Sequence, residues 1–216
     1  MKSAVIQGFE AGSDNSHYPK EDTIVKKTVN ILTLIAVIVF CLCLTSCDSK
    51  PAATADELFD FTFKINNDQF TIPSDIDAFT NAGWSFPANF DAIDKTVTPS
   101  NLETTYLENG DNWFNVEIFN ADTKEIATKD CPIGRVTYDF SGDIEIYTSG
   151  DFLLNGKTAK DVIARYGKPL SEAEYGGYTE IIYDADPDDS IYDRYTFRFD
   201  DDSGEIIYFD IINFDM

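Results

Sequence analysis

An uncharged apolar segment near the N-terminus most constrains what this chain can fold into. Residues 28–46 contain no Asp, Glu, Lys or Arg, and Lys26 and Lys27 stand immediately before them. A basic pair followed by an apolar run is typical of a secretion signal, because the cations stay cytoplasmic while the apolar run enters the lipid. We therefore expect residues 1–46 to be a signal peptide, which leaves residues 47–216 to build the mature protein.

The apolar segment ends in Leu44-Thr45-Ser46-Cys47. This tetrapeptide resembles the lipobox of bacterial lipoproteins, in which a Leu and two small residues precede an invariant Cys. The resemblance implies cleavage between Ser46 and Cys47 and attachment of diacylglycerol, with acyl chains such as palmitate, to the Cys47 sulfur. A thiolate is the nucleophile that this lipidation needs, and two or more acyl chains anchor a protein stably. The protein is thus expected on the cell membrane, facing the extracytoplasmic side.

Two alternatives stay open for this region. The run 28–46 is long enough to span a bilayer, so an uncleaved single-span membrane protein is the first. The second concerns residues 1–23, a polar stretch with Glu10 and Asp14 that precedes the basic pair where a signal peptide would normally begin. A true translation start near Ile24 would explain this stretch, and sequencing of the unprocessed precursor tests that hypothesis.

Composition excludes several classes of function. The chain has 39 acidic and 16 basic residues, a net charge of −23, and the charges of the signal peptide cancel, so the mature chain keeps this value. Such a chain cannot neutralise a phosphate backbone, and no nucleic-acid partner is expected. His17 is the sole His and is lost with the signal peptide, which argues against His-based catalysis and zinc sites. With Cys47 lipidated, no intrachain disulfide can form, and Cys131 is expected to be a buried thiol whose pKa Asp130 raises.

Alternating sequences dominate the mature chain and predict antiparallel strands. Apolar and polar residues alternate with period two in residues 59–65, 113–119, 135–140 and 194–199. Turn sequences at residues 66–68 and 201–204 predict hairpins that continue into residues 70–72 and 206–214.

Two short helices are predicted between these strands. The first helix is expected to have Ser74 as its N-cap, residues 75–81 as its body and Gly83 as its stop. The second is expected to open with a capping box from Thr158 to Asp161 and to continue over residues 161–166. It should end at Gly167, with Pro169 following. Aromatic-rich strands follow each helix. The expected fold class is therefore α+β, with two small units that each pack a short helix on an antiparallel sheet. These units are residues 57–141 and residues 142–216, after a lipidated tether at residues 47–56.

A further resemblance is carried by Thr158-Ala159-Lys160-Asp161-Val162 and Tyr166-Gly167-Lys168-Pro169. With these segments, the C-terminal half resembles the helix-then-sheet unit of the small bacterial lipoprotein BamE and the repeats of beta-lactamase inhibitor protein. Residues 59–138, with Ala82-Gly83-Trp84 and Asp130-Cys131-Pro132-Ile133, resemble lipoproteins common in clostridia. The resemblance implies a fold and no particular activity, because one fold hosts many functions.

Acidic residues provide the weak candidate for a metal site. Asp184, Asp186 and Asp188 alternate, and alternating carboxylates can converge on a calcium ion. Against an EF-hand loop that starts at Asp184, however, Asp189 replaces the glycine of position 6 and Tyr195 the glutamate of position 12. A solvated hairpin loop is the favoured interpretation, and neither a metal nor another cofactor is expected.

Asp210 is the acid that least resembles ordinary surface, because it interrupts the apolar residues of 206–212. An acid in this position can have a perturbed pKa and a functional role. The alternatives are that Asp210 lies on an exposed face of the strand or pairs with an Arg. No Ser-x-x-Lys, Gly-x-Ser-x-Gly or phosphate-binding Gly loop occurs in the sequence. No catalytic residue is therefore assigned, and an enzyme is not expected.

The expected function is that of a membrane-anchored binding module for a protein or cell-surface partner. The alternatives are a secreted hydrolase that uses carboxylates alone and a solute-binding lipoprotein, for which residues 47–216 are short. The 11 Tyr and 17 Phe residues are typical of a strand core, and also of a glycan or peptide groove. Asp48, directly after Cys47, resembles the inner-membrane retention signal of lipoproteins in hosts with an outer membrane.

Overall fold

The computed structural model describes residues 54–188 and 193–214. These residues form an α+β structure in which antiparallel strands predominate and helices are short, which confirms the predicted fold class. The predicted signal peptide and the lipobox residues Leu44, Thr45, Ser46 and Cys47 lie outside the described residues. None of the described helices is both long and apolar enough to cross a membrane.

The described elements up to residue 139 are η1 (Ala55–Asp60), β1 (Thr62–Ile65), β2 (Asp68–Thr71), α2 (Ile76–Asn81), η2 (Asp91–Asp94), β3 (Thr96–Val97), β4 (Leu102–Asn109), β5 (Asn112–Phe119), β6 (Ile126–Ala127), η3 (Thr128–Asp130) and β7 (Ile133–Asp139). After them come β8 (Ile146–Thr148), β9 (Phe152–Leu153), α3 (Ala159–Tyr166), β10 (Ser171–Tyr175), β11 (Tyr178–Asp184), β12 (Asp193–Asp200) and β13 (Ile206–Asn213). The order of hairpin, short helix and antiparallel strands therefore occurs twice along the chain.

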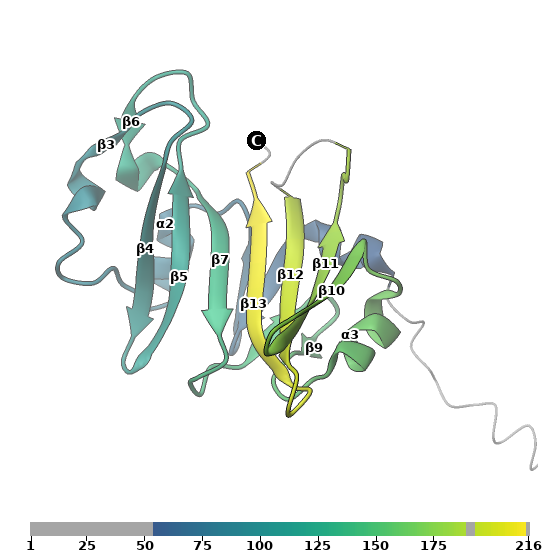
Figure 1. Ribbon diagram of the computed structural model, residues 1–216. Helices are drawn as coiled ribbons and strands as arrows, with labels where there is room; N and C mark the ends of the chain where they lie inside the picture. The colour runs from purple at the N-terminus through teal and green to yellow at the C-terminus, as the bar shows by residue number, and fades with distance from the viewer. Residues whose placement is uncertain (1–53, 189–192, 215–216) are drawn as a thin grey trace, which may run out of the picture. The chain divides into compact units, whose positions relative to one another are not determined.

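Two sheets connect the two halves of the described residues. The large sheet has the order β10-β11-β12-β13-β7-β5-β4 (Figure 1), and the small sheet has the order β2-β1-β8-β9. In the large sheet, β13 pairs with β7 and places Phe209 opposite Tyr138. In the small sheet, β1 pairs with β8 and places Phe63 opposite Thr148. Because both junctions are hydrogen-bonded, residues 51–216 form one compact unit.

Aromatic residues fill the space between the two layers. Figure 1 shows the β1–β2 hairpin and α2 behind the large sheet. Three ring contacts join this second layer to the large sheet: Phe63 with Phe209, Phe79 with Phe114, and Tyr166 with Tyr183, at centroid distances of 6.3, 5.9 and 6.2 Å. The small sheet and both helices therefore cover the same face of the large sheet, and the core lies between them.

The helices follow the predicted caps closely. The capping box of α3 is confirmed, since Asp161 N donates to Thr158 Oγ1 at 3.4 Å and Thr158 N donates to Asp161 Oδ2 at 2.9 Å. Both predicted stop glycines have the positive φ that favours this residue at a helix end. The first helix differs by one residue, because Asp75, and not Ser74, stands at its N-cap and makes no side-chain capping bond.

The strand prediction is wrong at its N-terminal end. β1 begins at Thr62, whereas Phe59 belongs to η1. This helix ends at Asp60 and is followed by Phe61, which has a left-handed φ of +48°. Leu58 is completely buried in this 3-10 helix, so tertiary burial overrides the local alternation. β4 and β10 escaped prediction because their apolar content is low: Leu107 is the one buried residue of β4, and β10 has none.

Candidate binding surface

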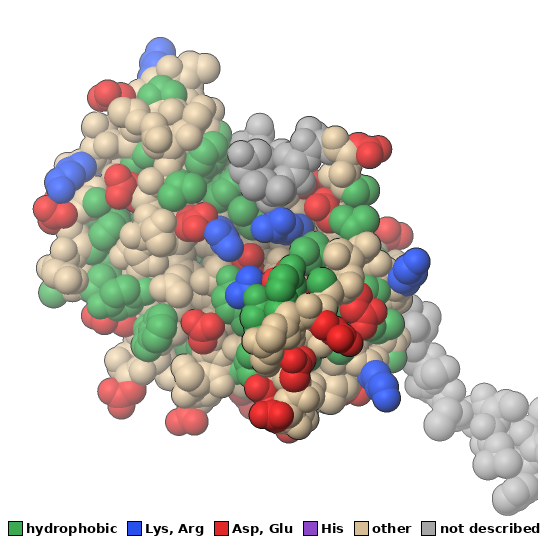
Figure 2. All heavy atoms as spheres, in the orientation of Figure 1, with side chains coloured by type: hydrophobic (Ala, Val, Ile, Leu, Met, Phe, Trp, Pro, Cys, Tyr) green, Lys and Arg blue, Asp and Glu red, His purple; other side chains and the backbone are tan. Residues whose placement is uncertain are grey.

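The structure leaves one face of the large sheet uncovered by the other described elements. Val136, Phe197 and Phe209 point into the core, and strand alternation directs their neighbours to the opposite face. We call the following residues on that side the outer-face cluster: Arg194, Thr196 and Arg198 of β12, Tyr208 and Asp210 of β13, Arg135 and Thr137 of β7, and Asn115 and Glu117 of β5. Figure 2 shows Lys and Arg side chains gathered near the middle of this face. The cluster holds three of the four arginines of a strongly acidic chain.

Arg135 is the centre of an ion-pair network in this cluster. Its Nε and Nη2 donate to the two carboxylate oxygens of Asp210 at 2.7 and 3.0 Å, and its Nη1 donates to Glu117 Oε1 at 3.0 Å. Asp210 is 2% exposed. Burial raises the pKa of the Asp210 carboxyl, and the Arg135 charge opposes this increase. The hydrogen bonds to Asp210 raise the pKa of Arg135, which keeps the guanidinium charged.

Arg198 occupies a second polar arrangement on the same face. Its Nε donates to Glu180 Oε2 at 2.8 Å, and its Cζ lies 5.1 Å from the Tyr178 ring centroid and 4.5 Å from that of Tyr208. A cation held between aromatic faces and a carboxylate is a stable arrangement, because the ring quadrupole and the anion both attract it. The rings of Tyr178 and Tyr208 are therefore already engaged by the protein's own cation.

Two buried polar atoms close to Asp210 lack a hydrogen-bond partner within the described ranges. They are Arg194 Nε and Thr196 Oγ1, and Thr196 lies directly opposite Asp210 in the strand register. Buried donors are normally satisfied, so these two atoms are exceptions in the packing of this face. A separate hollow of about 310 Å³ on this face has a lining that includes Glu117, Arg135 and Tyr208.

The sequence-predicted site residues are separated in the structure. Asp210 lies at the centre of the outer-face cluster and pairs with an Arg, which was one of the predicted outcomes. Asp184 and Asp186 accept hydrogen bonds from the backbone N–H groups of Asp186 and Asp188 at 3.0 and 3.1 Å, as in a solvated loop. Within residues 54–188 and 193–214, no group of three or more His, Cys, Asp or Glu is arranged to hold a metal ion.

Cys131 is a buried thiol, as predicted. It is 2% exposed, and its Sγ lies 3.5 Å from the Ala127 carbonyl oxygen. Burial, and next the Asp130 charge, raises the pKa of the thiol. The sulfur therefore stays protonated near neutral pH and contributes to packing.

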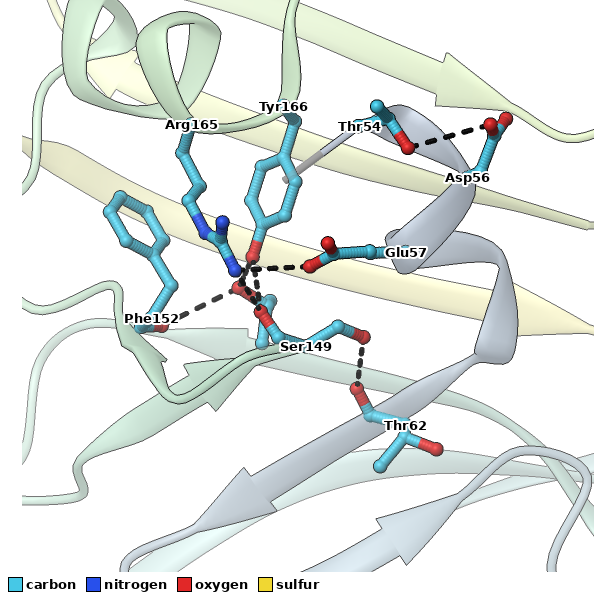
Figure 3. A network of polar contacts seen from close by, with 9 residues as sticks. Thr54, Asp56, Glu57, Thr62, Ser149, Phe152, Arg165 and Tyr166 are labelled. Carbon is cyan, nitrogen blue, oxygen red and sulfur yellow. Dashed lines mark hydrogen bonds and ion pairs between the residues drawn. The ribbon is translucent and has the colours of Figure 1, made fainter. Parts of the chain in front are cut away.

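The first described helix, η1, begins at Ala55, inside the predicted tether of residues 47–56, and is fastened to the second half of the chain (Figure 3). Arg165 Nη2 donates to Glu57 Oε2 at 3.1 Å and to the Ser149 carbonyl oxygen at 3.3 Å. Tyr166 Oη donates to the same carbonyl at 3.0 Å. Ser149 Oγ in turn donates to the Thr62 carbonyl oxygen at 3.3 Å. α3 and the loop after β8 thereby hold η1 and the start of β1 in place.

A comparison with models of known protein families, with curated proteins and with solved structures finds no match for this chain. The site therefore has to be interpreted from its own residues. Sequence reasoning missed the grouping of Arg135, Glu117, Arg194 and Arg198. The alternation of β5, β7 and β12 places each of them on the polar side of its strand, but only the strand order places them together.

Proposed function

We propose that this protein is a lipid-anchored extracytoplasmic lipoprotein that acts as a binding module through the outer face of its large sheet. The anchor is supported by the basic pair, the apolar run and the lipobox-like tetrapeptide that ends at Cys47. The charge of −23 supports a folded part that stands away from an anionic membrane surface on the predicted tether, residues 47–56. A tether of this kind raises the local concentration of the module, so that a modest interface suffices.

The observation that supports binding best is the uncovered face of the large sheet with its arginine cluster. Interfaces are enriched in Arg and Tyr, the residue types that are grouped here. Catalysis by carboxylates alone is the weaker candidate, because Asp210 and Glu117 both accept hydrogen bonds from Arg135 and are occupied by it. A general acid or base has to exchange its proton with a substrate, and a bidentate guanidinium opposes protonation of Asp210.

We also propose that residues 57–141 and 142–216 are two related units that share their sheets. Their repeated order of hairpin, short helix and antiparallel strands supports this, as does the pairing of equivalent strands, β1 with β8 and β7 with β13. Antiparallel pairing of equivalent strands is what a two-fold relation between two copies produces.

The anchor is tested by replacing Cys47 with Ser in a bacterial host supplied with an alkyne-labelled fatty acid. We expect label on the wild-type protein in the membrane fraction, and none on the C47S protein, because an alcohol does not replace the thiolate nucleophile. Intact-mass analysis should show that C47S retains residues upstream of position 47. Label that persists on C47S, or an unlabelled cytosolic wild-type protein with its first residues intact, would contradict the anchor.

The binding face is tested by charge reversal at Arg198 in a soluble protein of residues 51–216. We expect Arg198→Glu to abolish retention of a cell-surface partner in a pull-down, because it places two carboxylates together beside Tyr208. Lys64→Glu is the matched control on the small sheet, since the side chain of Lys64 is 32% exposed and paired with Asp151, and that of Arg198 is 36% exposed and paired with Glu180. Equal retention by both variants, each with a wild-type circular dichroism spectrum, would contradict this face.

A further inference from the structure

The β4–β5 hairpin carries an exposed aromatic corner at one end of the outer face. The ring centroids of Tyr106 and Trp113 lie 6.2 Å apart with their planes at 70°. Trp113 is 46% exposed, although tryptophan is a large apolar side chain that usually contributes to a core. A hollow of about 430 Å³ adjoins the two rings, and Glu108, Asp111 and Asn112 complete its lining together with Gly110.

The charge of this hollow is uniformly negative. Glu108 and Asp111 supply two carboxylates to its lining, which contains neither Lys nor Arg. No ion pair or side-chain hydrogen bond engages either carboxylate within the described part of the chain. Two unneutralised anions beside two aromatic rings attract cations through the Coulomb term and through the ring quadrupoles.

The same face contains an occupied version of this chemistry. Arg198 lies over the rings of Tyr178 and Tyr208 and is bound by the carboxylate of Glu180. The corner of Tyr106 and Trp113 has the two rings and the carboxylates, whereas no described Lys or Arg lies over either ring. The corner therefore has the rings and carboxylates of a cation site, and no described Lys or Arg occupies it.

We propose that the aromatic corner of Tyr106 and Trp113 binds an organic cation, with Glu108 and Asp111 as its counter-charges. This inference deepens the proposed binding function and rests on it. The chemistry fits a quaternary ammonium group and also the side chain of Lys or Arg in a basic partner. Each of these cations has an apolar part that can contact a ring face while its charge interacts with the ring. Each is also attracted by a chain with a charge of −23.

The test is a titration of ¹⁵N-labelled residues 51–216 followed through the two tryptophan indole N–H signals. The chain has two Trp residues, and Trp84 is 3% exposed, so it reports on the core while Trp113 reports on the corner. The probes are choline and its uncharged isostere 3,3-dimethyl-1-butanol. We expect choline to shift the Trp113 signal alone. The neutral isostere should bind about two- to fivefold more weakly, the loss that corresponds to one cation–π contact at an exposed site.

Two variants assign the contacts. Trp113→Leu should abolish the response of Tyr106 to choline in a parallel aromatic spectrum, and Glu108→Gln should weaken choline binding several-fold while it leaves the fold unchanged. Nα-acetyl-lysinamide and Nα-acetyl-argininamide form the second arm. Tighter binding of these than of choline identifies a basic partner, and the reverse identifies a small quaternary ammonium ligand.

Equal binding of choline and its neutral isostere, or no shift of Trp113 with any of the cations, would overturn the inference. This result is distinguishable from failure of the proposed function. A partner that is retained by the wild-type protein and lost with Arg198→Glu supports the binding face even if the corner binds no cation. Conversely, cation binding at Trp113 without a retained protein partner supports the cation site and contradicts the binding face around Arg198.

Discussion

Replacement of Arg135 by Met is expected to lower the free energy of unfolding by about 3 kcal/mol, since removal of one partner leaves a buried charge uncompensated. Asp210 would lose two hydrogen bonds while its side chain remains 3% exposed. The value lies at the lower end for buried pairs because the Arg135 side chain is itself 26% exposed. Urea denaturation of residues 51–216 at neutral pH measures the change.

The double variant Arg135→Met/Asp210→Leu is the control for this result. It should recover more than half of the lost stability, because an apolar pair replaces an ion pair with little net change. Glu117, whose side chain is 19% exposed, retains access to water in that variant. A single-variant loss below about 1 kcal/mol, the range of exposed pairs, would show that the network is not the buried element described above.

At acidic pH, the free energies of unfolding of Arg135→Met and of the wild-type protein should differ less than at neutral pH. Burial already raises the pKa of Asp210 above its unfolded value of about 3.9. A carboxyl of this kind contributes stability that is present below the unfolded pKa and lost as the pH rises through the folded pKa. Without the opposing Arg135 charge the folded pKa rises further, so the deficit is largest at neutral pH and smallest below about pH 4. A deficit that is independent of pH would contradict an ionised Asp210.

The second large effect is expected at Phe79 of α2. Its ring is completely buried, stacks on Phe70 of β2 at a centroid distance of 4.2 Å with planes 3° apart, and contacts Phe114 of β5. Phe79→Ala should lower the free energy of unfolding by about 3–5 kcal/mol, because it opens a cavity where helix, small sheet and large sheet meet. Thermal and urea denaturation both measure this loss.

Tyr175→Ala is the matched control for Phe79→Ala. Tyr175 is also an aromatic residue in a ring stack, at 5.1 Å from Tyr178, but it is 48% exposed. Its replacement should change the free energy of unfolding by no more than about 0.5 kcal/mol, as for ordinary surface positions. Similar losses of unfolding free energy in both variants would mean that burial does not determine how much each ring contributes to stability.

Local features of this chain were predictable from the sequence. The capping box of Thr158 and Asp161, the stop at Gly167 and the turn before Ile206 depend on interactions between residues a few positions apart. Such interactions are already present in the local sequence pattern. Two local predictions were wrong: the N-cap of α2 is Asp75 and not Ser74, and η1 replaces the start of the predicted first strand, where Leu58 is completely buried.

The candidate site was predictable only in part. Asp210 is conspicuous in the sequence because it interrupts an apolar strand, and an Arg partner was one of the expected outcomes. The identity of that partner was not predictable, since Arg135 lies 75 residues away and reaches Asp210 through the pairing of β7 with β13. The corner of Tyr106 and Trp113 carries no distinctive sequence signal, because alternating aromatics in strands are usually core residues.

The sequence by itself determined most of the long strands, the capping box of α3, the acidic charge and the expectation of a lipid anchor at Cys47. The tertiary structure decided which side of each strand became core and which became surface. The physical reason is that alternation defines two faces for every strand but does not say which face a second layer covers. In this protein the small sheet and two helices cover one face of the large sheet, and the polar residues of five separate strands meet on the other.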